Sequence, residues 1–314
     1  IDPKSRLPKF LGEYGLFADP AKQITNEGLI PYSLNTGHFA DNANVSRFLW
    51  LPPGEKVGYH ATDRFTFPVG AALIQTFAFP VPEDESTEQL VETRVLLNQP
   101  GKGWTLSAYK WDETNTNAKK ALAGGLVTVR YTDPDAGLVE TNYLIPNKND
   151  CMRCHENEGV LYALGLTARN LNRDVDYGDG VTNQLAHWIE SGILAGAPED
   201  LAAVDKGPEW DNPETGTVTE RARMWLDVNC AHCHNPKGAG NVSGLDLTIN
   251  QQNPVRYGAY KPPVAAGRGS EGLRFSIEPG HPENSFIIRR LRSTDPSIMM
   301  PPLGRMSASK GAEE

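Results

Sequence analysis

Short runs of β-branched and aromatic residues, separated by turn sequences, dominate the chain from about residue 44 to residue 145. Pro-Pro-Gly and Asp-Pro-Asp-Ala-Gly are among the turns that punctuate this stretch. Strands of this length and spacing are typical of an antiparallel sandwich. We therefore expect an N-terminal β-sandwich-like domain over residues 1–146. The predicted strands cover residues 47–51, 65–79, 92–97, 104–111, 126–131 and 138–144.

The pattern changes after this stretch. Polar residues 147–150 are suited to cap a short helix. Apolar residues recur near every 3.6 positions in 183–194 and in 220–234, which predicts two more helices, and a short one is expected near 284–291. Residues 195–219 are acidic and rich in Gly and Pro, so they are expected to form a linker.

Composition narrows the class of protein. A chain of 314 residues suggests two or three domains. Its net charge of −9 weighs against nucleic acid as a partner. No apolar run is long enough for a membrane span, and four cysteines are too few for a disulfide scaffold. The placement of these cysteines therefore becomes the informative feature.

The four cysteines form two copies of a Cys-x-x-Cys-His motif. On a helix, positions i, i+3 and i+4 share one face, so two thiols can add to the vinyl groups of one porphyrin while the histidine reaches the iron. The motifs predict two covalently attached haem c groups in two small, mainly α, cytochrome c-like modules, residues 147–212 and 213–314. The whole is then a multidomain α+β protein. The attachment residues are Cys151, Cys154, Cys230 and Cys233, and the proximal iron ligands are His155 and His234.

Two other uses of the cysteines fit less well. A zinc ribbon separates its two pairs by roughly 15–20 residues, a much shorter interval than the one between Cys154 and Cys230. Zinc also gives no reason for a histidine directly after each pair. A thioredoxin-like redox pair needs a βαβ pattern, which neither motif has nearby.

The second axial ligand of each iron is predicted separately. Met300 precedes Pro301, and proline can hold a loop methionine rigidly, so Met300 is expected on the second iron with Met299 as the alternative. For the first iron we expect His187, which gives bis-histidine ligation. His60, His38 and a histidine of a neighbouring subunit are the alternatives.

Six ordered segments resemble a bacterial family of exported dihaem c-type cytochromes. The likeness runs from about residue 28 to residue 305. It implies haem content and export, and it supports Met300 and the two Cys-x-x-Cys-His motifs as site residues. The segments are residues 31–36, 67–70, 143–147, 168–173, 183–185 and 221–230, and the closing stretches 279–285 and 299–302 resemble the tail of many exported cytochrome modules.

Haem is attached outside the cytoplasm, so we expect a periplasmic, cell-surface or extracellular protein whose export signal is absent from the sequence. The expected function is electron transfer between the two haems and external redox proteins, without enzymatic activity. One alternative is a homopolymer of this chain, a filament in which haems continue from one copy to the next. Another is a dihaem peroxidase, although such enzymes lack a long β domain before the first motif.

Overall fold

The computed structural model describes residues 1–4, 6–178, 180–264 and 267–308. It contains two compact units. Unit 1 comprises residues 1–35, 42–151 and 161–207, and unit 2 comprises residues 36–41, 152–160 and 208–314. Among the described residues, no helix is long and apolar enough to cross a membrane.

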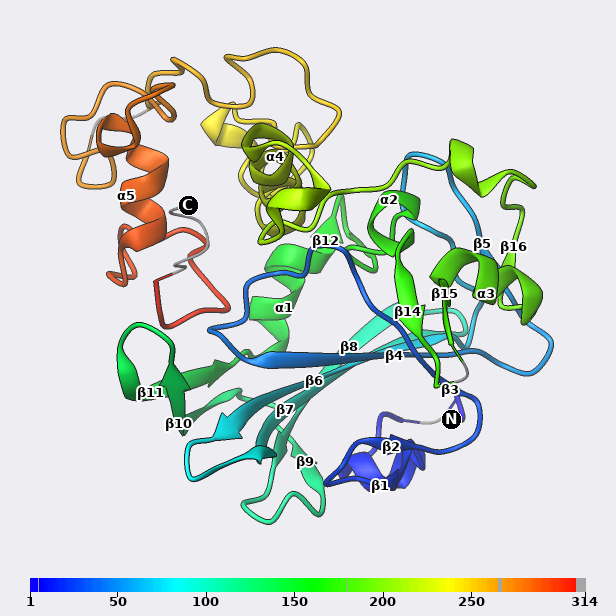
Figure 1. Ribbon diagram of the computed structural model, residues 1–314. Helices are drawn as coiled ribbons and strands as arrows, with labels where there is room; N and C mark the ends of the chain where they lie inside the picture. The colour runs from blue at the N-terminus through cyan, green and yellow to red at the C-terminus, as the bar shows by residue number, and fades with distance from the viewer. Residues whose placement is uncertain (5, 179, 265–266, 309–314) are drawn as a thin grey trace. The chain divides into compact units, whose positions relative to one another are not determined.

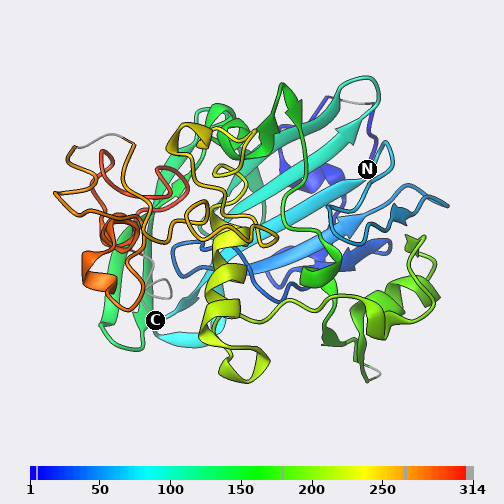
Figure 2. The ribbon, with the colours of Figure 1, turned by 90° about the horizontal axis from the view of Figure 1, so that it is seen from above.

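Unit 1 is built on a six-stranded antiparallel sheet in the order β3-β4-β6-β7-β8-β9. These strands lie side by side as a twisted layer (Figures 1 and 2). The β-rich N-terminal half is thus confirmed, because each predicted run contributes a strand or part of one. The sheet strands are Leu29–Pro31, Asn44–Trp50, Ala72–Val81, Asp84–Gln99, Gly103–Trp111 and Ala118–Lys120 for β3, β4, β6, β7, β8 and β9.

Both faces of the sheet are buried, which explains why its central strands carry consecutive buried apolar residues at 48–49, 72–74 and 95–97. One face packs against residues Leu171 and Leu185 of helices α2 and α3 and against the fully buried Trp188. The other face is covered by the N-terminal segment, including Leu11 and Leu16. The elements of these covering segments are η1 (Leu11–Tyr14), β1 (Phe17–Asp19), β2 (Ile24–Thr25), α2 (Ala168–Leu171) and α3 (Gln184–Glu190).

A hairpin of β10 (Gly125–Asp133) and β11 (Gly137–Ile145) packs against the C-terminal half of β6. Aromatic contacts join Phe79 to Tyr131 and to Tyr143. The covering layers are therefore helices, loops and a hairpin, and they differ from the second large sheet that a sandwich requires. The hairpin strands were predicted; their separation from the main sheet was not.

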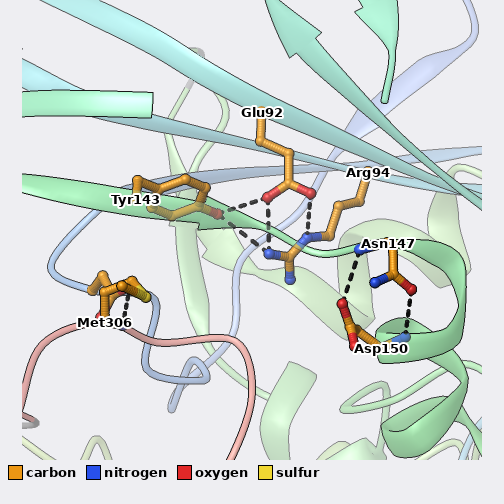
Figure 3. A network of polar contacts seen from close by, with 7 residues as sticks. Glu92, Arg94, Tyr143, Asn147, Asp150 and Met306 are labelled. Atoms are coloured by element: carbon orange, nitrogen blue, oxygen red, sulfur yellow. Dashed lines mark hydrogen bonds and ion pairs between the residues drawn. The ribbon is translucent and has the colours of Figure 1, made fainter. Parts of the chain in front are cut away.

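Tyr143 of this hairpin reaches an ion pair within strand β7 of the sheet (Figure 3). Both guanidinium contacts of Arg94 to the fully buried Glu92 measure 2.8 Å, and the Tyr143 hydroxyl donates to the same carboxylate at 2.7 Å. Burial lowers the pKa of Arg94, but the charge of Glu92, its hydrogen bond and the nearby Tyr143 together outweigh burial, so the pKa is raised. The network therefore favours the charged guanidinium of Arg94.

The remaining strands are short. β5 and β16 pair in parallel and join residues 57–58 to 194–195, whereas β12 pairs with β13 and β14 with β15. Their bounds are Val57–Gly58 (β5), Glu156–Asn157 (β12), Val160–Leu161 (β13), Asp174–Asp176 (β14), Val181–Asn183 (β15) and Leu194–Ala195 (β16).

Unit 2 contains helices α4 (Val218–Asn229) and α5 (Phe286–Arg292), which lie within long irregular segments (Figure 1). The short helix expected near residues 284–291 is confirmed as α5. Two separate α haem modules are not seen as such, because residues 161–207 pack into unit 1. The boundaries predicted for the three domains stay predictions. The 3₁₀ turns η2 (Leu201–Ala203) in unit 1 and η3 (Pro213–Thr215), η4 (Asn241–Ser243) and η5 (Pro282–Asn284) in unit 2 complete the elements.

Candidate haem site

The first Cys-x-x-Cys-His motif lies on helix α1 (Lys148–His155), as its spacing predicts. Asn147 and Asp150 cap the start of the helix with two reciprocal hydrogen bonds (Figure 3). The Asp150 carboxylate accepts from the backbone nitrogen of Asn147 at 3.1 Å, and the Asn147 side chain accepts from the backbone nitrogen of Asp150 at 3.2 Å. This confirms the predicted cap. Cys151 belongs to unit 1, whereas Cys154 and His155 belong to unit 2.

The second motif begins where α4 ends. The helix starts with a capping box between Thr217 and Glu220 and stops at Asn229, five residues before the end predicted from the sequence. It ends because Cys230 leaves the helical conformation, and the nitrogens of Cys230 and Ala231 both donate to the Leu226 carbonyl. The side chain of Asn229 donates to the Trp225 carbonyl and accepts from the Phe39 nitrogen at 2.7 Å. The prediction of a continuous helix through residue 234 is therefore wrong.

One helical turn nevertheless persists within the second motif. The Cys230 carbonyl accepts hydrogen bonds from the nitrogens of Cys233, at 3.1 Å, and His234, at 2.8 Å. The i, i+3 and i+4 relationship that haem attachment requires is thereby kept in a single turn. Gly238 and Gly240 close the loop tightly over it: an added Cβ would lie 2.2 Å from the Cys233 carbonyl oxygen and 2.9 Å from His234 Nδ1, respectively.

Unit 2 contains a cavity of about 630 Å³ that this motif lines. Cys230, Cys233 and His234 all border it, together with Met300. Most of the remaining lining is apolar, including Leu245, Leu247, Phe286, Leu291 and Leu303. The volume and the apolar lining are typical of a cofactor pocket.

The hydrogen bonds of Ser243 fix the tautomer of His234. The Ser243 hydroxyl donates its single proton to the Gly240 carbonyl at 2.7 Å. The 2.9 Å contact between Ser243 Oγ and His234 Nδ1 must then have the imidazole as donor. With its proton on Nδ1, the ring keeps a lone pair on Nε2, the atom that can bind iron. Burial lowers the pKa of His234, which also favours the neutral ring.

Met300 rather than Met299 lines the cavity. Its backbone nitrogen donates to the carbonyl of Arg290 in α5 at 3.0 Å. The guanidinium of Arg290 in turn donates to the Ile298 carbonyl at 2.8 Å. These two bonds tie residues 298 and 300 of the methionine loop, residues 297–303, to helix α5.

A second clamp secures the segment after Met300. Arg305, only 1% exposed, donates to the carbonyls of Arg290, Ser293 and Ser307. The buried carboxylate of Asp41 accepts from the nitrogens of Met306 and Ser307 and from the Ser307 hydroxyl. Burial raises the pKa of Asp41, although these hydrogen bonds and the nearby charge of Arg305 oppose the effect.

The first motif contributes Cys154 to the same cavity. Ligand atoms of Cys154, His232 and Cys233 lie within 4.8 Å of one another. A hydrogen bond with Cys233 and burial raise the pKa of the Cys154 thiol to about 12. The same hydrogen bond lowers the pKa of Cys233, although burial opposes it. Burial alone raises the pKa of Cys230 to about 12. His232, which lies inside the second motif, also borders the cavity.

The other histidines occupy different surroundings. His187 is half-buried on α3 and stacks on Tyr177 with ring centroids 3.8 Å apart. His60 is exposed, and its Nδ1 accepts from the nitrogens of Thr62 and Asp63, so in this tautomer Nε2 carries the proton. His38 lies in the segment of residues 36–41 in unit 2. The ligand of the first iron stays a prediction.

The donor set around the cavity fits a c-type haem. It offers two thiols one helical turn apart, an imidazole with a free Nε2 and a thioether, in a mostly apolar pocket. It fits zinc less well, because structural zinc takes four ligands and the cluster around Cys154 has three among the residues described. Around the first motif, the structure brings only Arg153 and Cys154 into this cavity.

Residues 230–304 match the model of a family described as Planctomycete cytochrome C. The match begins at Cys230 and includes Met300, so it contains the two thiols of the second motif, the imidazole of His234 and the thioether that border the cavity. It supports a cytochrome c-type family, with covalently bound haem and a general role in electron transfer. No curated protein and no solved structure matches the chain.

Sequence reasoning missed the residues that support the ligands. Ser243 and Gly240 follow the motif closely, so a search for a hydroxyl and small residues just after it could have found them. Asp41 and Arg305 are far apart in the sequence, and no local pattern connects them. Only the folded chain shows that they secure the methionine loop.

Proposed function

We propose that this chain is a dihaem c-type cytochrome that transfers single electrons between its two haems and external redox proteins. The observation that carries the proposal is the cavity of unit 2, where both thiols of a Cys-x-x-Cys-His motif, an imidazole with a free Nε2 and Met300 converge. The same helical spacing recurs on α1, where the first motif, Cys151, Cys154 and His155, would hold the other haem.

The protein side chains perform three tasks at the cavity. Cys230 and Cys233 provide the covalent attachment, and His234 provides a neutral imidazole in the tautomer that Ser243 selects. Met300 supplies a soft sulfur that favours reduced iron. When bound, the haem iron provides a one-electron couple. If His234 and Met300 both held the iron, no position would be left there for peroxide, so we propose an electron carrier rather than an enzyme.

Proximity of the two motifs supports transfer between two haems. Sγ of Cys154 and Sγ of Cys233 both belong to the cluster whose ligand atoms lie within 4.8 Å of one another. Each sulfur would be bonded directly to its own porphyrin, so the two attachment points adjoin. We further propose that the mature protein works in the periplasm or outside the cell, where haem is attached to such motifs.

Haem counting tests the proposal. Intact-mass measurement and a pyridine haemochrome spectrum should give two haems per chain in the exported protein. The double variants Cys151→Ala/Cys154→Ala and Cys230→Ala/Cys233→Ala should each retain one. A wild-type protein with one haem or none would contradict the dihaem function.

A redox titration follows the axial ligands. The site with Met300 should titrate at the higher potential, because a methionine ligand raises the potential relative to bis-histidine ligation. His187→Ala should convert one haem to a high-spin spectrum, whereas His281→Ala should not, since His281 is exposed and pairs with Glu283. A low-spin spectrum for both haems in His187→Ala would exclude His187 as the ligand.

A further inference from the structure

Six cationic side chains gather around the edge strand β9 of unit 1, and we call this group the basic patch. Lys110 of β8 lies directly opposite Lys119 of β9 in the strand register. The backbone nitrogen of Lys120 donates to the carbonyl of Lys9 at 2.9 Å. Burial and the charges of Arg6 and Lys148 lower the pKa of Lys120. The members of the basic patch are Arg6, Lys9, Lys110, Lys119, Lys120 and Lys148.

This arrangement costs stability and runs against the charge of the chain. Like charges directly opposite one another in an antiparallel pair are destabilising. The whole chain carries −9, yet among the described residues no carboxylate forms an ion pair with any member of the basic patch. Two ammonium groups reach only carbonyl oxygens, Lys110 that of Leu126 and Lys120 that of Leu7.

An apolar depression lies within the basic patch. Its volume is about 580 Å³, and its lining includes Phe10 and Leu122, which are 37% and 77% exposed. The one carboxylate in the lining is Asp112, whose oxygens accept from Thr114, Thr116 and Asn117. Exposed apolar side chains surrounded by charges of one sign are typical of surfaces that dock a protein of opposite charge.

The basic patch adjoins the first haem motif. Lys148 is the first residue of α1 and precedes Cys151 by one helical turn. Gly124, which lines the depression, packs against the residue before α1: an added Cβ there would lie 3.0 Å from the backbone nitrogen of Asn147. Edge protection by lysine would account for Lys119 and Lys120 alone. It leaves Arg6, Lys9 and Lys148 unexplained.

We propose that the basic patch docks a redox protein with an acidic surface, which exchanges electrons with the haem on α1. The inference rests on the proposed function and names the class of its partner. The cations attract the partner over long range, and Phe10 with Leu122 provides the apolar contact. Such steering should fall steeply with ionic strength.

Stopped-flow reduction of the oxidised holoprotein by flavodoxin hydroquinone, an acidic one-electron donor, tests this inference. The double variant Lys110→Glu/Lys119→Glu should lower the second-order rate constant about 10-fold or more at low salt. It should also flatten the dependence of the rate on salt. The matched control is Lys22→Glu/Lys56→Glu, which changes the net charge equally at two exposed lysines outside the basic patch. Its rate should stay within about twofold of wild type.

A single variant separates docking from folding. Lys119→Glu places opposite charges across the β8–β9 pair, so it should raise the thermal midpoint while still slowing reduction by flavodoxin. Equal slowing by patch and control variants, or a salt-independent rate in wild type, would overturn the inference. Reduction by the photogenerated semiquinone of 5-deazariboflavin, a small uncharged donor of very low potential, should be the same in all variants. A wild-type protein that this small donor cannot reduce refutes the proposed function itself.

Discussion

His234 Nδ1 and Ser243 Oγ lie 2.9 Å apart, and the hydroxyl can only accept there because its proton is given to Gly240. A hydrogen bond accepted from Nδ1 increases electron donation by the imidazole to a bound metal. One serine thus selects the tautomer of the proximal histidine and tunes its basicity.

Replacing this serine should change the potential of the second haem. In Ser243→Ala the imidazole donates less to ferric iron, so the midpoint potential should rise by on the order of tens of millivolts; a tenfold change in a one-electron equilibrium is about 59 mV. Ser243→Thr keeps the hydroxyl and should restore most of the wild-type value. Spectroelectrochemistry measures both. An unchanged potential in Ser243→Ala would show that the hydroxyl has no effect on the iron.

Gly240 should tolerate no side chain. A Cβ there would lie 2.9 Å from His234 Nδ1 and 3.0 Å from the Cys233 carbonyl oxygen. Gly240→Ala should therefore displace the imidazole, lower the yield of six-coordinate haem and reduce the thermal midpoint. Gly125→Ala is the matched control, since a Cβ at that position meets no atom within 4 Å. Comparable absorption spectra and midpoints for the two variants would contradict this account.

The sequence predicted the chemistry of the candidate site better than its surroundings. Cys-x-x-Cys-His spacing is a local pattern, so Cys230, Cys233 and His234 could be named together, and the proline after Met300 marked that loop. Strand positions were also predictable, because β-branched runs are local. What covers the sheet depends on distant segments: Trp188 was expected in a haem module and instead packs in the core of unit 1. The side chain of Asn229, the last residue of α4, accepts from the Phe39 nitrogen, a contact that no periodicity shows.

Arg305 should be required for methionine ligation. Arg305→Met removes hydrogen bonds to three carbonyls and leaves Asp41 buried without a nearby charge, so unfolding should become easier by about 3 kcal/mol. The near-infrared charge-transfer band of methionine-bound ferric haem should weaken at temperatures where the variant is still folded. Arg305→Lys keeps the charge without the planar fork and should fall between.

Two further variants delimit this effect. Arg256→Met removes an exposed arginine of the same unit and should leave the band intact. The double variant Asp41→Asn/Arg305→Met should lose less free energy of unfolding than the two single variants lose together, because the two residues are coupled. A full-strength band in folded Arg305→Met would show that Met300 is held without the clamp.

The capping box of α4 predicts a pH dependence of stability. Hydrogen bonds from the Thr217 hydroxyl and backbone nitrogen lower the pKa of Glu220 from its ordinary value of 4.5. A carboxyl group whose pKa is lower in the folded state stabilises the fold above its unfolded pKa, and this contribution is lost as the pH falls through the folded value. Wild type should therefore be more stable than Glu220→Gln at neutral pH, and the difference should disappear on acidification below about 4.5.

Thr217→Ala should lower the free energy of unfolding by about 1 kcal/mol at neutral pH. Part of this loss should remain in acid, since the Thr217 hydroxyl also accepts from the Glu220 nitrogen. Thermal midpoints of the three proteins across the acid range measure both effects, and a difference between wild type and Glu220→Gln that does not vary with pH would mean that the carboxylate charge plays no part in the cap.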